Sequence, residues 1–238
     1  MIASHAGRGF QRSGLCVKPP SGLESPNRER PAQLPGQLNV TLSRLRRLAR
    51  FDLDVLDEAA KDGRSTVPSL SVAVGATLLL GLGGWLWWLL SGLGDVRQSD
   101  SVFVKSVLFG SMASLGLWGV WLLIVVALMQ RFAGTIVQIE PLLRAAGLAA
   151  APLSLGLLMA VPVISFGIGL LAIVGCVLFT QAAIERVTGV RGGEVIFANL
   201  VGFVVWAVLL SLLTTSNNQF APGPFLAESL WDLVASAG

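Results

Sequence analysis

The longest uncharged stretch of the sequence most constrains the fold. Residues 145–184 contain no Asp, Glu, Lys, Arg or His. As a single α-helix at about 1.5 Å per residue, this stretch would be about 60 Å long, twice the ~30 Å of a bilayer's hydrocarbon core. It therefore predicts two crossings, 145–161 and 163–184, with Pro162 at the turn because proline interrupts a helix.

The other apolar segments agree with a membrane environment. Of the 238 residues, 53% are hydrophobic and 13% are charged, whereas soluble domains carry about 25% charged residues. A span needs about 20 apolar residues, and three further segments satisfy this requirement: 69–92, 106–129 and 195–213. The sequence predicts an all-α membrane protein with a five-helix transmembrane bundle over residues 68–214.

Lysine and arginine are distributed unevenly about these spans. Fifteen fall on the side of the N-terminus and two, Arg97 and Lys105, fall on the opposite side. Cytoplasmic loops carry an excess of positive charge in membrane proteins, so we expect a cytoplasmic N-terminus and an external C-terminus. A single crossing by residues 145–184 would place Arg186 and Arg191 on the wrong side.

The segments outside the spans differ in character. Residues 1–37 hold five of the eleven prolines and show no apolar periodicity, so they predict a disordered leader. Residues 38–67 predict cytoplasmic amphipathic helices, the first an N-terminal juxtamembrane helix and the second capped by Asp52. Residues 215–238 predict an external tail that contains a short interfacial helix over 224–236.

The first amphipathic helix has an apolar face and a basic face. The apolar residues are Leu38, Leu42, Leu45, Leu48 and Ala49, and the basic residues are Arg44, Arg46, Arg47 and Arg50. We expect the arginines to bind an anionic lipid surface, at about 1 kcal/mol per basic residue. The alternative is a general positive flank with no specific ligand.

Small residues form a stripe along the fourth span. Helices in lipid associate through close packing of small side chains, so we predict that the stripe faces other helices. The alternative is a face that lines a path for a solute. The stripe consists of Ser165, Gly169, Ala172, Cys176, Thr180 and Ala183.

Charged residues beside the spans suggest a second surface on the cytoplasmic side. One interpretation is a docking surface for a membrane-protein partner, and the other is a solvated helix edge whose exposed ion pairs contribute little. No ionisable residue lies within a predicted span, and Asn199 and Gln181 are expected to bond between helices. The charged residues are Arg131, Arg144, Glu185, Arg186 and Arg191.

The sequence lacks the motifs of common catalytic and cofactor sites. It contains no HExxH, GxSxG or Walker loop. The single histidine, His5, and the two distant cysteines, Cys16 and Cys176, offer no metal or disulfide framework. The net charge of +3 is too small to indicate nucleic acid. We therefore expect a protein that is not an enzyme, uses no cofactor or metal, and has lipids and membrane proteins as partners.

Short motifs follow one another in a characteristic order along the chain. They are RFDLDVLDE at 50–58, RFAGT at 131–135, LLRAAG at 142–147 and QAAIERVTG at 181–189. This order resembles the bacterial branch of the Yip family, five-span membrane proteins named for yeast members that bind Rab-type GTPases. The similarity covers about residues 44–212. The chain has no tyrosine and lacks the Asp-Leu-Tyr-Gly-Pro segment of the eukaryotic relatives, so the resemblance implies the five-span fold rather than GTPase binding.

The resemblance also implies a role. It indicates a non-enzymatic scaffold or membrane-organising adaptor, integral to a bacterial plasma membrane. Two alternatives remain open at this stage: a small uncoupled permease or channel subunit, and an accessory subunit of a larger membrane complex.

Overall fold

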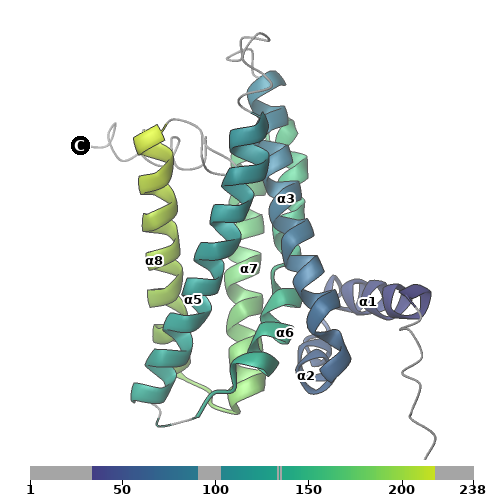
Figure 1. Ribbon diagram of the computed structural model, residues 1–238, viewed down its shortest axis with the longest axis vertical. Helices are drawn as coiled ribbons and strands as arrows, with labels where there is room; N and C mark the ends of the chain where they lie inside the picture. Colours follow the sequence, from purple (N-terminus) through teal and green to yellow (C-terminus); the bar gives the residue numbers. More distant parts are fainter. Residues whose placement is uncertain (1–33, 91–102, 133, 135, 218–238) are drawn as a thin grey trace, which may run out of the picture. The chain divides into compact units, whose positions relative to one another are not determined.

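The computed structural model describes residues 34–90, 103–132, 134 and 136–217, and these residues form helices and turns without any strand. From Pro35 onward they belong to one compact unit. Most of the predicted leader, Arg97 and the predicted tail helix over 224–236 lie outside the described residues. The helices, shown in Figure 1, are α1 (Leu34–Leu48), α2 (Asp54–Lys61), η1 (Gly63–Ser65), α3 (Thr66–Leu90), η3 (Val104–Gly110), α5 (Ser111–Phe132), α6 (Ile139–Ala149), η4 (Ala151–Ala160), α7 (Ser165–Thr188) and α8 (Gly193–Asn217).

Five helical segments of the described part are long and apolar enough to cross a membrane. This finding confirms the all-α fold class with a five-helix bundle, and residues 145–184 fall in two of the five segments. The chain turns between the two crossings at 161–164, a turn that includes Pro162. The five segments are Gly63–Leu90, Val107–Phe132, Ile139–Ala160, Ser165–Thr188 and Gly193–Leu212.

The helix of the third span begins before the predicted crossing 145–161. It starts at Ile139, so Glu140 and Arg144 belong to its first two turns. Arg144 pairs with Glu140 one turn away on the same helix, which offsets the two opposite charges.

The third span also changes its helix type. After α6 it continues as the 3₁₀ helix η4, with a proline at its start. A 3₁₀ helix rises about 2.0 Å per residue, and runs longer than about four residues are uncommon. This one extends over ten residues and packs between α3 and α7, whose support explains why such a long 3₁₀ segment persists.

The contact between α3 and η4 is unusually close. A Cβ atom added at Gly83 would lie 1.8 Å from the carbonyl oxygen of Gly156, and a Cβ at Gly156 would lie 2.8 Å from the Cα of Leu80. Real side-chain atoms do not approach a backbone this closely, so the crossing requires glycine at both positions. Sequence analysis did not identify this pair, because each glycine lies in a segment already rich in small residues.

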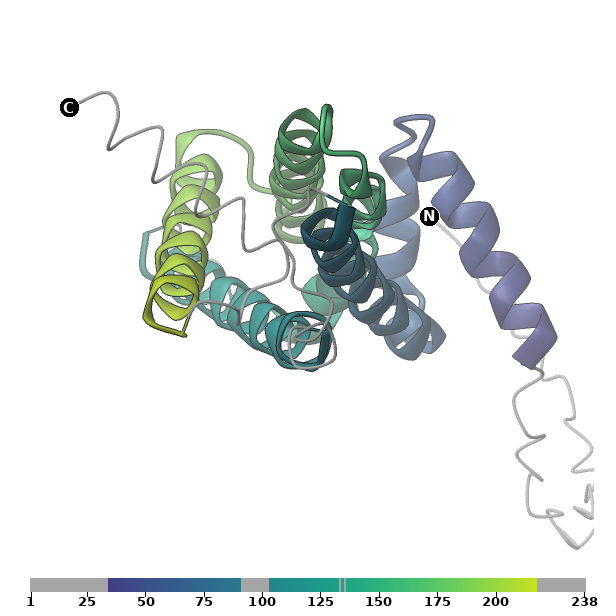
Figure 2. The ribbon, with the colours of Figure 1, turned by 90° about the horizontal axis from the view of Figure 1, so that it is seen from above.

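Two groups of helices make up the bundle. η4 packs between α3 and α7, whereas α5 packs mainly on α8 (Figure 2). Asn199 on α8 connects the groups, since Trp121 Nε1 on α5 donates to its Oδ1 at 3.1 Å and its Nδ2 donates to the Val177 carbonyl on α7 at 3.1 Å. The predicted interhelical role of Asn199 is confirmed. Gln181 instead donates to Glu185 within α7, so the prediction of an interhelical bond is wrong there.

Candidate functional site

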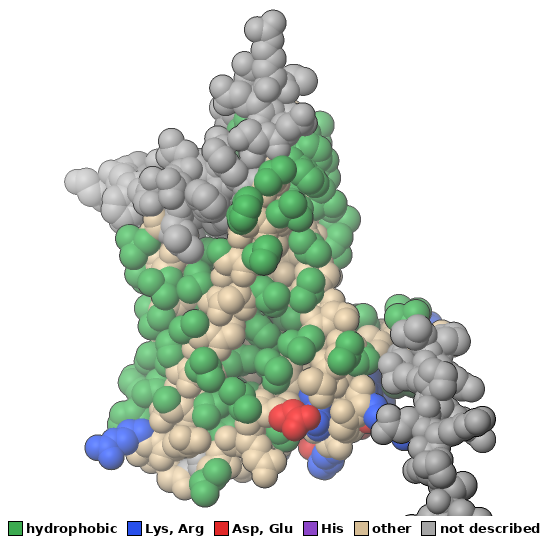
Figure 3. Space-filling model, viewed as in Figure 1, with side chains coloured by type: hydrophobic (Ala, Val, Ile, Leu, Met, Phe, Trp, Pro, Cys, Tyr) green, Lys and Arg blue, Asp and Glu red, His purple; other side chains and the backbone are tan. Residues whose placement is uncertain are grey.

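Charged side chains gather at one end of the bundle. Among the side chains that the structure describes, all charged ones belong to α1 and α2 or lie near the end where α3, α6 and α8 begin. Figure 3 shows them below a largely apolar surface. We call this end the charged end. It is the part of the described molecule where polar chemistry is concentrated.

Arg144 makes hydrogen bonds to several elements at the charged end. It is only 9% exposed. Its Nε donates to Thr66 Oγ1 at 2.8 Å, its Nη1 donates to the Ala60 carbonyl at 3.2 Å, and its Nη2 donates to Glu140. A buried guanidinium requires such partners. Arg144 therefore joins α6 to the end of α2 and the start of α3, and the expectation that it lies on an open docking surface is corrected.

Two of the four predicted lipid-binding arginines make ion pairs with other side chains. Arg44 pairs with Asp62 at 3.0 Å, and Arg47 pairs with Asp52 at 2.8 Å and with Glu58 at 2.9 Å. The hydrogen bond from Arg47 holds the pKa of Asp52 below its usual value, and the hydrogen bond from Arg44 does the same for Asp62. These pairs connect α1 to the region of α2, which corrects the view that all four arginines face lipid.

The other two predicted lipid-binding arginines, Arg46 and Arg50, remain available to contact an anionic surface. Arg46 and Arg50 are exposed and make no ion pair within the described part of the chain. On the apolar face, Leu38 and Leu42 are 69% and 67% exposed, whereas Leu48 is buried. α1 runs across the direction of the long helices (Figures 1 and 2). Leu38, Leu42, Arg46 and Arg50 thus form an exposed surface, along α1 and the turn after it, that no described part of the chain covers.

The turn after α1 fixes the direction of that helix. Phe51 has φ +62°, a left-handed conformation that is rare for a bulky residue. The Phe51 amide donates to the Leu48 carbonyl and the Asp52 amide donates to the Arg47 carbonyl, the pattern of a Schellman helix end, where glycine is usual. The Phe51 ring packs edge-on against Phe179 of α7, with ring centroids 6.0 Å apart. Phe51 is nevertheless 78% exposed, and the buried Leu48 beside it packs in an apolar cluster with Leu148 and Ala183 of the bundle. We call α1, α2 and this turn the platform.

Asp52, the predicted N-cap of the second helix, lies one residue before the observed cap position. The helix α2 begins at Asp54, and the residue at the cap position, Leu53, has no side-chain cap. Asp52 Oδ1 nevertheless accepts the amide of Asp54 at 3.2 Å. Asp52 therefore satisfies one amide at the start of α2 while its other oxygen accepts from Arg47.

The remaining residues of the predicted docking surface do not form one cluster. Arg186 pairs with Asp54 of α2, and Glu185 accepts from Gln181. Arg131 and Arg191 are exposed, and no ion pair links either of them to another described residue. Of the predicted docking residues, Arg186 therefore joins α7 to α2, whereas Arg131 and Arg191 point outward.

A groove lies among α2, α6 and α7 at the charged end. It has a volume of about 320 Å³. Three cations and one carboxylate contribute to its lining, together with three uncharged residues. The lining residues are Asp57, Ala60, Lys61, Pro141, Arg144, Arg186 and Val187.

The small-residue stripe of the fourth span faces inward. Ser165, Gly169, Ala172 and Cys176 are all buried, as are Thr180 and Ala183 further along the same face. Beside the stripe, a Cβ added at Gly175 would meet the ring of Pro152 at 3.0 Å. The arrangement is that of a helix-packing face against η4, as the interpretation of the stripe as a packing surface requires.

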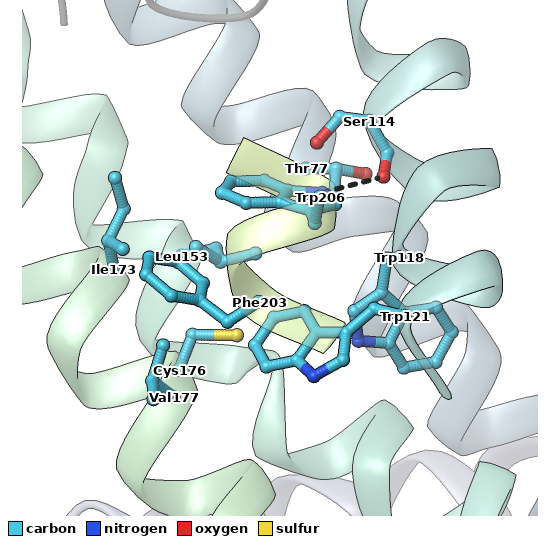
Figure 4. Close-up of a pocket in the computed structure, with 10 residues that line it drawn as sticks. All are labelled: Thr77, Ser114, Trp118, Trp121, Leu153, Ile173, Cys176, Val177, Phe203 and Trp206. Atoms are coloured by element: carbon cyan, nitrogen blue, oxygen red, sulfur yellow. Dashed lines mark hydrogen bonds between the residues drawn. The ribbon is translucent and has the colours of Figure 1, made fainter. Parts of the chain in front are cut away.

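A small cavity lies where the two groups of helices meet (Figure 4). It has about 10 Å³ in which the centre of a water molecule fits, roughly the minimum for one water. Ser114 Oγ and Trp118 Nε1 are buried without a hydrogen-bond partner. The lining residues are Thr77, Ser114, Trp118, Trp121, Leu153, Ile173, Cys176, Val177, Phe203 and Trp206. Sequence analysis did not identify this site, because its residues come from five separate helices.

No family model, curated protein or solved structure matches this chain. The chemistry of the charged end therefore rests on the geometry alone. Within the described residues, no three His, Cys, Asp or Glu side chains lie close enough together to hold a metal ion. The charged end provides a helical platform attached to the bundle, the exposed arginines Arg46, Arg50, Arg131 and Arg191, and a basic groove. These features are suited to binding a ligand or a partner.

Proposed function

We propose that this chain is a non-enzymatic integral membrane protein of the Yip type, a scaffold or membrane-organising adaptor that meets its partners through the platform. The charged end faces the cytoplasm of a bacterial cell in this proposal, as the excess of Lys and Arg indicates. The family assignment in this proposal rests on the order of short motifs over residues 44–212 alone.

One observation carries the proposal. The platform is held to the bundle by the buried Arg144 and by the pair between Arg186 and Asp54, yet α1 and the turn after it keep Leu38, Leu42, Arg46 and Arg50 exposed. A platform that is attached to the bundle and presents an uncovered amphipathic surface is suited to binding a membrane surface or a partner helix.

Site-specific photo-crosslinking in cells tests this role. A photoreactive residue at Leu42 should capture a defined protein partner, whereas the same residue at Leu171, which is exposed on the outer face of α7, should capture mainly lipid. Replacing Arg46 and Arg50 by Gln should weaken the partner adduct at Leu42 if the partner is acidic. Equal, diffuse labelling from both positions would contradict the adaptor role.

A second candidate is a small uncoupled permease or channel subunit. This candidate rests on the small cavity between the helix groups, where the Ser114 and Trp118 side chains provide unpartnered polar groups in the interior of the bundle. Purified protein in vesicles should then show saturable flux that changes in Ser114→Ala. Absence of flux, together with a partner adduct at Leu42, would favour the adaptor.

A further inference from the structure

The groove among α2, α6 and α7 has the position of a lipid-headgroup site. Pro141 and Arg144 lie in the first two turns of the third span, and Arg186 and Val187 lie in the last turn of the fourth. The ends of two adjoining membrane-spanning helices are found at the level of the headgroups. Given the membrane placement that the proposed function assumes, the groove opens where phospholipid phosphates lie.

The charge of the groove favours an anion. Lys61, Arg144 and Arg186 line it, whereas Asp57 is the sole carboxylate among its lining residues. The carboxylates of Glu140 and Asp54, which pair with Arg144 and Arg186, are not in the lining, and their side chains are 64% and 74% exposed. Each of the three lining cations thus has one carboxylate partner, Asp57 for Lys61, Glu140 for Arg144 and Asp54 for Arg186. The lining residues by themselves carry an excess of two positive charges, and a bound phosphate would share Arg186 with the exposed Asp54.

We propose that this groove binds the phosphate of an acidic phospholipid in the leaflet at the charged end. Lys61 and Arg186 are the cations that contact the phosphate. Arg144, already bonded to Thr66 and Ala60, adds its charge from the base of the groove. Basic pockets between transmembrane helices are known to suit such headgroups, and the acyl chains would follow the exposed apolar faces of the neighbouring helices.

Titration of the purified full-length protein with phosphatidylglycerol, followed by native mass spectrometry, tests the proposal. The double variant Lys61→Gln, Arg186→Gln should bind phosphatidylglycerol about 25-fold more weakly, at about fivefold per basic residue. The control variant Arg131→Gln, Arg191→Gln removes the same charge at the same end and should change affinity by less than about twofold. Equal losses in the two double variants would overturn the assignment.

Two single variants separate headgroup binding from a structural role of the ion pairs. Asp54→Asn breaks the pair with Arg186 but keeps the cation, so binding should be unchanged or tighter. Asp57→Asn removes the carboxylate from the lining and breaks the pair with Lys61, so binding should tighten several-fold. If both variants weaken binding, the ion pairs support the fold of the groove and no headgroup site exists.

Two further ligands identify the source of the phosphate. Phosphatidylcholine, which has the phosphate but no net charge, should bind weakly and equally to all variants. Inorganic phosphate at millimolar concentration should not displace phosphatidylglycerol; effective displacement would assign the groove to a soluble anion and overturn the lipid assignment. The titration uses the isolated protein, so its result is independent of whether a partner is captured at Leu42.

Discussion

Single residues decide how closely the helices of this bundle approach. In lipid, no hydrophobic drive brings helices together, and close packing replaces it. Gly83 and Gly156 allow the backbones of α3 and η4 to touch, and Gly147 similarly faces the Ser69 carbonyl, which a Cβ would approach to 2.7 Å. Each of these contacts is made against a backbone that cannot move aside without displacing a helix.

Gly83→Ala is expected to destabilise the protein by about 1–3 kcal/mol, because the added methyl group overlaps the Gly156 carbonyl and forces α3 and η4 apart. Thermal unfolding in detergent measures the effect. Gly75→Ala in the same helix is the matched control, since nothing lies within 4 Å of its added Cβ; it should be neutral or slightly stabilising. Equal midpoints for the two variants would contradict the close crossing.

Arg144→Gln is expected to lower stability by about 1–3 kcal/mol, because the Ala60 carbonyl and Thr66 hydroxyl lose their buried donor. Chemical unfolding in detergent reports the change. Arg131→Gln, which removes an exposed arginine, should stay within about 0.5 kcal/mol of the parent. If Arg144→Gln is as mild as Arg131→Gln, then Arg144 does not tie the third span to α2 and α3.

At the scale of elements, the platform depends on ion pairs between α1 and the carboxylates around α2. Hydrogen bonds from Arg47 and Arg44 lower the folded-state pKa values of Asp52 and Asp62. A lowered carboxyl pKa stabilises the folded arrangement above the unfolded pKa of about 4, and this contribution is lost as the pH falls through the folded pKa. α1 should therefore be docked at neutral pH and released in acid.

Spin labels at Leu42 and Lys61, with Cys16 and Cys176 replaced by Ala, measure this release. The distance distribution should be narrow at pH 6 and broaden as the pH falls below about 4. The variant Arg44→Gln, Arg47→Gln should be broad already at pH 6 and respond little to acid. A parent distribution that stays narrow at pH 3 would show that apolar contacts alone, such as Phe51 on Phe179, hold α1.

The sequence predicted the elements better than it predicted their contacts. Hydropathy and Pro162 located the crossings because both act through neighbouring residues. The helix of the third span extends further than hydropathy indicates, to Ile139, because the charges of Glu140 and Arg144 lower the hydropathy there while their mutual pairing is compatible with a helix. The assignment of Arg44 and Arg47 failed because their carboxylate partners determine which way they point. The Gly83–Gly156 contact depends on a pairing of helices that one sequence does not reveal.

At the scale of the whole molecule, an odd number of spans separates the two ends of the chain. Five helices of the described part are long and apolar enough to cross a membrane, so the account places the platform and the C-terminal end of α8 on opposite sides. The proposed adaptor role requires the platform, Arg131 and Arg191 to share the cytoplasmic side. The orientation of the bundle is therefore the claim on which the rest of the account depends.

Fusions to a reporter that is active only outside the cytoplasm test this claim most directly. The account predicts an active reporter when it is fused after Gly238 and an inactive reporter when it is fused after Arg191, in the loop between α7 and α8. The reverse pattern, or equal activity at both positions, would contradict the five-span topology with a cytoplasmic charged end.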